Sequence, residues 1–353
     1  MINYICLRLE EKYLDSFLYS GNLFLLGVDG VITTYDWSAL VSRAMEMHGG
    51  SELAHHFLDS RIAKYFPIGH PIDVHIPSRL LKEFERDKLR WNVWPTDINV
   101  YANKLFISDE SGISVVGVEY KTGRINAGDV RRIKSGYVYS ISPGDGGRLA
   151  AAGVEDGLSM LVYESRSKYS SKVLVPEDVV DCDWFGSDLV ANSRSHAYVS
   201  RFEPLPLKSD YPDRSEYKAK YNETLHQQPE VEKIDLEGSS AYVWLTGAGV
   251  VKDAAEKLGE SKVVRSRIVR ARAASFGSVV EYGDHVALMR SDGTCDLDVP
   301  RPIFWRTFSR SKNYLNQLHI CNDDGLQIRA YLVQPAASDK FAISLTDVDD
   351  RRP

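Results

Sequence analysis

The chain is poor in cysteine and lacks the short motifs by which several enzyme classes are recognised. Its 353 residues include four cysteines, none of which stands in a CxxC pair: Cys6, Cys182, Cys295 and Cys321. This spacing argues against the common zinc and redox motifs and predicts reduced thiols buried in strands. The sequence also has no GxxxxGK[ST], GxGxxG, GxSxG or HxE…CxxC pattern. Nucleotide hydrolases and nucleophile-elbow hydrolases are therefore not among the leading interpretations.

Long apolar runs and a strong charge excess are also missing. No stretch approaches the ~18 apolar residues that a membrane-spanning helix needs, and the first residues have neither a basic start nor a long apolar run. We therefore expect no membrane association and a cytoplasmic location. The formal charge is −6, from 43 basic and 49 acidic residues. This balance argues against a nucleic-acid binder that uses its whole surface, although it leaves room for a local basic patch.

The clearest positive signal is the segment Tyr137–Glu164, YVYSISPGDGGRLAAAGVEDGLSMLVYE. It predicts three short antiparallel strands, because two turn signals, Pro-Gly-Asp-Gly-Gly at 143–147 and Asp-Gly at 156–157, separate runs of apolar residues. Weaker copies recur along the chain, about forty to fifty residues apart where nothing is inserted. The copies lie at residues 23–36, 105–119, 189–199, 242–251, 286–297 and 320–331. This spacing is typical of one blade of a β-propeller.

The segment SISPGDGGRLAAAGVEDGLSMLVYE resembles a blade of the WD-repeat-like β-propellers. The resemblance implies an all-β, closed propeller in a single domain, residues 1–353, with about seven four-stranded blades. Six blades are the alternative, because the copy at 242–251 is poor and Gly30 to Gly112 spans nearly two periods. In closed propellers one terminal strand often completes the blade of the other terminus. We expect Ile2–Leu9 to pair near Gln327–Val333.

Two segments depart from the repeat. Residues 38–91 are predicted to form a mainly helical insertion between blades, with a helix starting at Ser78 and a short strand at Ile72–Ile76. Its role is either to cover one blade or to dock a partner. Residues 203–232 are polar and contain four prolines, which predicts a long loop between blades.

Five of the nine histidines fall in the first of these segments, at positions 48, 55, 56, 70 and 75. A metal site is not expected there, because no HxxxH or HExxH pair places two ligands on one helix face.

Acidic residues near the predicted axis of the propeller offer one candidate site. Asp181 and Asp183 share one face of a predicted innermost strand, and Asp97 holds a comparable position in an earlier blade. Such carboxylates suit a cation site or the acid pair of a glycosidase-like enzyme. They equally suit a hydrated channel wall or hydrogen bonds between blades. Spacing across blades is not readable from sequence, so no catalytic residue is assigned.

A basic run offers the other candidate site. Residues 262–272 contain four arginines on a predicted strand: Arg265, Arg267, Arg270 and Arg272. A bulge near Ile268 would bring all four to one side of that strand. Arg306 follows within a stretch that is rich in aromatic residues, and such a mixture suits phosphate or stacked bases. The other interpretation is a solvated strand face paired with some of the 49 acids.

These features favour a non-catalytic propeller scaffold or adaptor that assembles proteins, within a complex that also handles nucleic acid if the basic run binds phosphate. Its contacts are predicted to use the helical insertion and the four arginines, with no cofactor. The alternative is a propeller enzyme or small-ligand binder that uses Asp97, Asp181 and Asp183.

Overall fold

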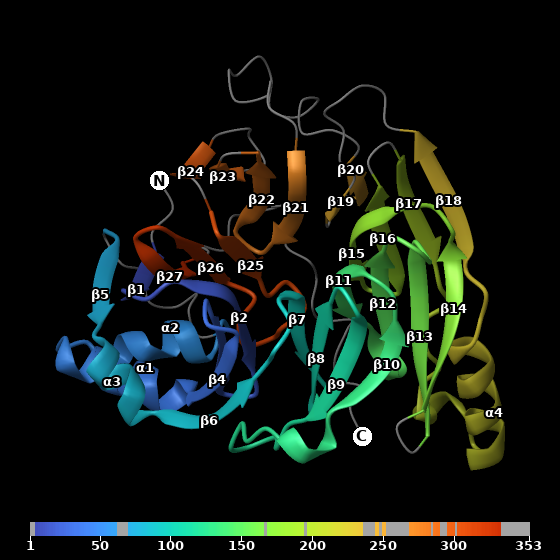
Figure 1. The fold of residues 1–353 in the computed structure, drawn as a ribbon, viewed down its shortest axis with the longest axis horizontal. Helices are drawn as coiled ribbons and strands as arrows, with labels where there is room; N and C mark the ends of the chain where they lie inside the picture. The colour runs from blue at the N-terminus through green and yellow to red at the C-terminus, as the bar shows by residue number, and fades with distance from the viewer. Residues whose placement is uncertain are drawn as a thin grey trace. The chain divides into compact units, whose positions relative to one another are not determined.

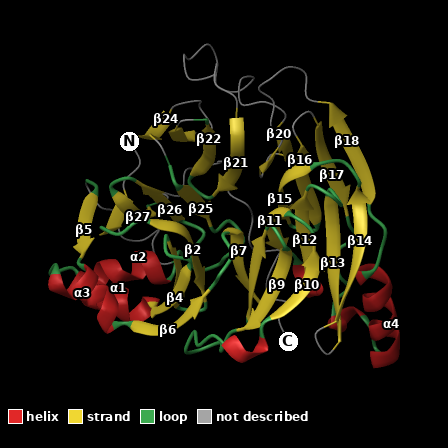
Figure 2. Ribbon diagram, in the orientation of Figure 1, coloured by secondary structure: helices red, strands yellow, loops and turns green. Residues whose placement is uncertain are grey.

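The fold is described from a computed structural model. It covers residues 4–61, 70–165, 168–193, 196–235, 244–246, 249–251, 268–283, 285–289, 295–300 and 302–332. Strands dominate these residues, and helices are few (Figures 1 and 2). Within the helices described there, none is long and apolar enough to cross a bilayer.

The described strands form six sheets of at least four strands. Five are four-stranded antiparallel meanders with the strand order of a propeller blade, and the sixth adds a strand in parallel at one edge. We number these blades along the chain. Blade 1 is β2 (Tyr13–Tyr19), β3 (Asn22–Gly27), β4 (Val31–Asp36) and β6 (Glu85–Arg90). Blade 2 is β7 (Pro95–Tyr101), β8 (Lys104–Asp109), β9 (Gly112–Gly117) and β10 (Arg131–Ser135). Blade 3 is β11 (Val138–Pro143), β12 (Arg148–Gly153), β13 (Leu158–Ser165) and β14 (Lys168–Val175). Blade 4 is β15 (Val179–Phe185), β16 (Asp188–Ser193), β17 (His196–Arg201) and β18 (Glu230–Asp235).

The last two blades come from the C-terminal part of the chain. Blade 5 is β21 (Ile268–Ala274), β22 (Gly277–Tyr282), β23 (His285–Met289) and β24 (Cys295–Pro300). Blade 6 joins β25 (Phe304–Thr307), β26 (Gln317–Asn322) and β27 (Gly325–Tyr331) to β1 (Tyr4–Leu9) and β5 (Ile72–Ile76).

The chain therefore has the β-propeller fold, and the residues that the structure describes form six blades, the alternative to seven. The doubtful copy at 242–251 gives only the two-stranded sheet of β19 (Trp244–Thr246) and β20 (Gly249–Val251) in the described part of the chain. The copy at 286–297 matches the third and fourth strands of its blade rather than the second and third.

The predicted pairing of the two ends is confirmed. β1 runs antiparallel to β27, with Tyr4 opposite Tyr331 and Leu9 opposite Leu326. On its other side β1 pairs in parallel with β5, so it is an interior strand of blade 6. Ile5, Leu7 and Leu9 share one face of β1, and all three are buried.

The clearest repeat, blade 3, shows why its turn residues are needed. Gly157 lies between β12 and β13 with φ +57°, a conformation that favours glycine. A Cβ atom there would lie 2.2 Å from the carbonyl oxygens of Val175 and Glu177. The glycine therefore permits both the turn and the close approach of the chain that leaves β14.

The helical insertion lies within a blade, between β4 and β6 of blade 1, and not between blades as predicted. It contains α1 (Trp37–Met47), a 3-10 turn (Ser51–Ala54), α2 (His55–Leu58), β5 and α3 (Ser78–Glu83). Asp36 starts α1 by accepting a hydrogen bond from the Ala39 N–H. The helix predicted from Ser78 ends at Glu83, and the charged residues that follow form the outer strand β6.

The segment predicted as a long loop, 203–232, also lies within a blade, between β17 and β18. It contains a 3-10 turn (Lys208–Asp210) and helix α4 (Arg214–Leu225), which Asp213 caps. Arg148 is buried and donates hydrogen bonds to the carbonyls of Thr224 and Leu225 at the C-terminal end of α4. A cation at that end suits both the free carbonyls and the helix dipole. This helix was not predicted from the sequence, because only its last turn is buried and it therefore has no apolar face along its length.

The contacts divide the chain into two compact units that interleave in sequence. Unit 1 comprises residues 1–94, 116–130 and 240–342, and unit 2 is built mainly from residues 95–115 and 131–239. Unit 1 therefore contains blades 1, 5 and 6. Its largest hydrophobic core is formed by residues of β1, β5 and α1 together with residues of β2, β3 and β27. Unit 2 holds most of blade 2 with blades 3 and 4, and its largest core lies between blades 3 and 4.

Candidate functional site

The polar residues of the innermost strands share one backbone feature. In five of the six described blades, the pairing of the first and second strands shifts by one residue near the start of the first strand. A bulge of this kind re-aims the next side chain. The residue directly after the bulge is polar each time: Asp15, Asp97, Ser140, Asp181 and Arg270.

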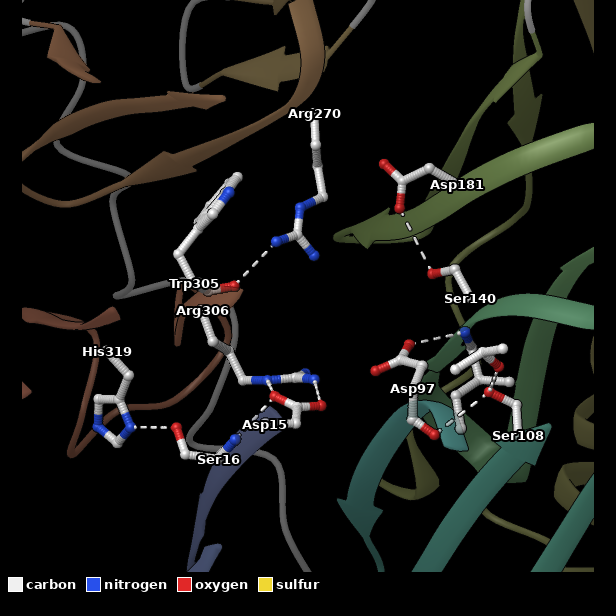
Figure 3. A network of polar contacts seen from close by, with 12 residues as sticks. Asp15, Ser16, Asp97, Ser108, Ser140, Asp181, Arg270, Trp305, Arg306 and His319 are labelled. Atoms are coloured by element: carbon white, nitrogen blue, oxygen red, sulfur yellow. Dashed lines mark hydrogen bonds and ion pairs between the residues drawn. The ribbon is translucent and has the colours of Figure 1, made fainter. Parts of the chain in front are cut away.

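In unit 2 these residues join neighbouring blades. Asp97 of blade 2 accepts a hydrogen bond from the backbone N–H of Ile141 in blade 3, at 2.9 Å. Ser140 of blade 3 lies 3.4 Å from Asp181 of blade 4 and donates to its Oδ1 (Figure 3). Asp181 is 6% exposed. The two carboxylates thus accept hydrogen bonds from inner strand β11. Hydrogen bonding between blades was one of the interpretations that the sequence left open for these residues.

Asp183, two residues after Asp181 on β15, also joins blades 3 and 4. Its Oδ1 accepts hydrogen bonds from the Ser142 hydroxyl at 3.0 Å and from the Trp184 N–H at 2.9 Å. The Trp184 indole N–H in turn donates to the Ser142 carbonyl at 2.9 Å. The structure therefore brings Asp181 and Asp183 to one interface, between blades 3 and 4, and places Asp97 at the interface of blades 2 and 3.

In unit 1 the equivalent residue, Asp15, forms an ion pair that sequence reasoning missed. The Arg306 guanidinium donates through Nε to Oδ1 at 3.1 Å and through Nη2 to Oδ2 at 2.6 Å (Figure 3). The side chains are 17% (Arg306) and 11% (Asp15) exposed. Such a two-pronged pair between blades 1 and 6 has strict geometry, and it leaves a buried charge if either partner is removed.

A buried histidine completes this cluster. The Ser16 hydroxyl and His319 Nδ1 are 2.7 Å apart, and both residues are fully buried. Burial lowers the pKa of His319 to about 3, with a smaller contribution from the positive charge of Arg306. His319 is therefore neutral at ordinary pH, and the pair lies out of reach of a substrate in solution.

Arg270, one of the four predicted partner-binding arginines, also lies at an inner strand of unit 1. Its guanidinium donates to the Trp305 carbonyl at 3.1 Å (Figure 3). The guanidinium also lies 3.4 Å from a Glu281 oxygen and 4.3 Å from the centre of the Trp305 ring. The Trp305 indole donates to the same Glu281 carboxylate at 2.6 Å. This contact joins blades 5 and 6. The bulge predicted near Ile268 is confirmed, since the pairing shifts between Ile268 and Arg270.

The rest of the basic run is only partly visible. Arg272 is half-buried and donates to the Ala271 carbonyl at 2.9 Å. Arg265 and Arg267 lie outside the described residues. Whether the four arginines share one surface therefore stays a prediction.

The aromatic residues near Arg306 have a structural role. Phe304, Trp305 and Phe308 are all less than 9% exposed and belong to the cores of unit 1. These rings are packed inside and are not available to stack bases, which argues against the base-stacking interpretation of this stretch. Sequence alone does not separate a buried aromatic run from an exposed one.

The histidines of the insertion do not gather around one point. His56 is buried, which lowers its pKa to about 4, whereas His75 is half-exposed and lies 3.2 Å from Glu10. Within the described ranges, no group of three or more His, Cys, Asp or Glu side chains has the geometry to hold a metal ion. Cys6, Cys182 and Cys321 are buried free thiols on strands, as predicted.

Asp15 and Arg306 were detectable in part from sequence. Tyr-Leu-Asp at 13–15 has the same pattern as Pro-Thr-Asp at 95–97 and Val-Val-Asp at 179–181, with a polar residue two places after the strand begins. The partner on another blade was not detectable, since 291 positions separate Asp15 from Arg306.

Comparisons with known proteins identify the fold and no closer relationship. No protein-family model matches the chain, and no curated protein matches it. A Dos1 propeller aligns over 93% of this chain and 80% of its own length, with 9% identity and a TM-score of 0.50. At this identity the likeness concerns the fold alone.

Two further structures align with lower scores. The PorZ component of the type-IX secretion system of Porphyromonas gingivalis aligns over 95% of this chain, with 13% identity and a TM-score of 0.38. The chain spans 40% of the length of PorZ. The Cps50 (Swd1) propeller of Myceliophteria thermophila aligns over 68% of this chain and 97% of its own, with 11% identity and a TM-score of 0.40.

Proposed function

We propose that the protein is a non-catalytic propeller scaffold whose helical insertion binds a protein partner. The observation that carries this proposal is a hollow of about 590 Å³ on the insertion, lined by Ala39, Ser42, Arg43, Glu46, Ser51 and Phe84. It lies on the side of α1 opposite the core. Trp37, Leu40 and Val41 hold the inner side of α1 against the sheet, whereas Ser42 and Arg43 are exposed.

The lining of the hollow suits a polypeptide surface. Arg43 and Glu46 form an exposed ion pair, 2.8 Å apart, which can exchange partners with charged groups of another protein. Phe84 supplies a half-buried aromatic ring beside them. Aromatic and arginine side chains are over-represented among the residues that contribute most to protein interfaces.

The inner-strand carboxylates support the same proposal over the enzyme alternative. Asp97, Asp181 and Asp183 each accept a hydrogen bond from a neighbouring blade. This use stabilises the propeller. Substituting any of them with Asn is therefore expected to lower stability, whereas a specific turnover lost in such a variant would favour the enzyme alternative.

The basic run at residues 262–272 remains part of the proposal, with three of its four arginines. Arg270 is engaged with Trp305 and Glu281, so its reversal would disturb the interface of blades 5 and 6. We therefore propose Arg265, Arg267 and Arg272 as the testable arginine contacts, toward a protein or a nucleic acid.

The test is co-purification of the tagged full-length chain with its partners from the source cells, followed by mass spectrometry. Ser42→Trp places a large ring in part of the hollow, and Arg43→Glu reverses the charge of one lining residue, so each is expected to reduce recovery of the main partner several-fold. Arg79→Glu is the matched control, because Arg79 lies on α3 of the same insertion, is 93% exposed and does not line the hollow. Equal recovery with all three folded variants would place the interface elsewhere.

A further inference from the structure

A second surface of the molecule combines exposed apolar side chains with an excess of acidic residues. It lies in unit 2, at the ends of blades 2 to 4 where the second strand turns into the third and where one blade passes to the next. Four of these connections are residues 110–111, 136–137, 154–157 and 176–178. Their charged residues are all acidic: Glu110, Glu155, Asp156, Glu177 and Asp178. The connections at the opposite ends of these blades, such as 202–229, carry both signs.

Contacts between three of these connections join them into one continuous surface. The Val154 N–H donates to the Tyr137 carbonyl at 3.3 Å, and the Glu155 carboxylate lies beside Gly136. Gly157 packs against the Glu177 carbonyl. We call Tyr137, Val154, Glu155, Asp156 and Glu177 the acidic edge.

The acidic edge has an apolar centre. Tyr137 is 38% exposed and Val154 is 43% exposed, although both are large hydrophobic residues. The Tyr137 ring lies 5.0 Å from that of Tyr139, so the exposed ring is held in place by a neighbour. A rigid exposed aromatic ring gives contact area with little loss of side-chain freedom on binding.

The charges around this centre are only partly balanced. Asp156 pairs with Lys134, and Glu177 pairs with Lys233 at 2.9 Å. Glu155 is exposed, and no ion pair joins it to another residue in the described ranges. The edge therefore keeps a negative excess next to its aromatic centre.

We infer that the acidic edge is a docking surface for a basic, amphipathic segment of a protein partner. The negative excess attracts lysine and arginine, and it repels phosphate polymers. An arginine of the partner can stack on the Tyr137 ring and pair with the Glu155 carboxylate. Apolar side chains of the same segment would cover Val154. The inference rests on the proposed scaffold function and names a class of partner for a surface distinct from the insertion.

The test measures binding of a labelled peptide to the purified full-length chain by fluorescence anisotropy. The probe is a fluorescein-labelled twelve-residue peptide in which arginine and leucine alternate. Two control peptides replace leucine with serine or arginine with glutamate. Titrations at low and high salt separate the electrostatic part of the affinity, because exposed charges are screened as salt rises.

We expect the arginine–leucine peptide to bind tightest and to weaken at high salt. Glu155→Lys should weaken it about fivefold or more, and the double variant Tyr137→Ser, Val154→Ser about tenfold, as central interface residues do. Glu203→Lys is the matched control: it makes the same charge change on an exposed residue of unit 2, in the 202–229 connection. Its affinity should equal that of the unmodified chain.

Two results would overturn the inference. One is equal binding of the arginine–leucine and arginine–serine peptides, which would show attraction to charge alone. The other is equal weakening by Glu155→Lys and Glu203→Lys. Either result leaves the co-purification test of the insertion unaffected, so failure of the acidic edge is distinguishable from failure of the scaffold function.

Discussion

The strongest stability prediction concerns Leu7 in β1, the strand that joins the two ends of the chain. Leu7 is fully buried, and it lies opposite Ile328 of β27 on one side and Val74 of β5 on the other. Replacing it with alanine removes three carbon atoms from a site whose neighbours are held by ladders on both sides. The cavity therefore has little freedom to collapse.

The expected loss follows from measured core truncations. Leu-to-Ala changes in packed cores lower the free energy of unfolding by about 2–5 kcal/mol, and sites that relax least lie near the upper end. We expect Leu7→Ala to lie in the upper half of that range. Deletion of residues 2–9 removes Ile5, Leu7 and Leu9 together, and is expected to consume most of the 5–15 kcal/mol by which domains are typically stable.

The assay is urea unfolding followed by far-ultraviolet circular dichroism. Arg8→Ala is the matched control, because Arg8 is the next residue on the same strand and its ion pair with Asp73 is exposed. Exposed pairs contribute ~1 kcal/mol or less. If Leu7→Ala and Arg8→Ala lowered the free energy of unfolding equally, β1 would not be an interior strand and the reasoning would be refuted.

Three further predictions concern buried ionisable side chains. Arg306→Met leaves Asp15 buried without its partner and should lower the free energy of unfolding by about 3–5 kcal/mol, whereas adding Asp15→Leu should recover part of that loss in a double-mutant cycle. Burial lowers the pKa of His319 to about 3, so the unfolded chain binds a proton that the folded chain does not. His319 should therefore make stability fall by about 1.4 kcal/mol per pH unit as pH drops from 6.5 toward 3, and thermal melts of His319→Gln should show a slope that is smaller by this amount. Arg148→Met removes the donor to the last carbonyls of α4, so trypsin should cleave within residues 214–225 faster than in the unmodified chain, and an unchanged cleavage rate would contradict the anchoring role.

Local patterns in the sequence determined the blade unit. The turns at 143–147 and 156–157 place residues with suitable backbone freedom between runs that alternate or stay apolar, and β11, β12 and β13 form there. The same reasoning located β5 at Ile72–Ile76 and the pairing of β1 with β27. These features depend on neighbours in sequence or on the general need to cover a sheet edge, so composition and order suffice to find them.

The outer strands were not predicted from the sequence, because they lack the apolar runs that identify the inner strands. β6, ERDKLR, and β18, EVEKID, pair on one side only and carry charges, so they were assigned to a helix and to a loop. As a result the two insertions were placed between blades, although each lies between the third and fourth strands of one blade. An edge strand takes its conformation from the strand that it pairs with, and this partner is a tertiary fact.

The roles of the inner-strand charges were also decided by tertiary structure alone. Asp97 and Asp181 were identified from sequence, but their donors come from β11, more than 40 residues away. Arg306 resembled part of a phosphate site until its partner Asp15 was known. A charged side chain has the same local signature whether it faces solvent, a ligand or another blade. Only the three-dimensional arrangement determines which of these it meets, because the free energy of a charge depends on what surrounds it.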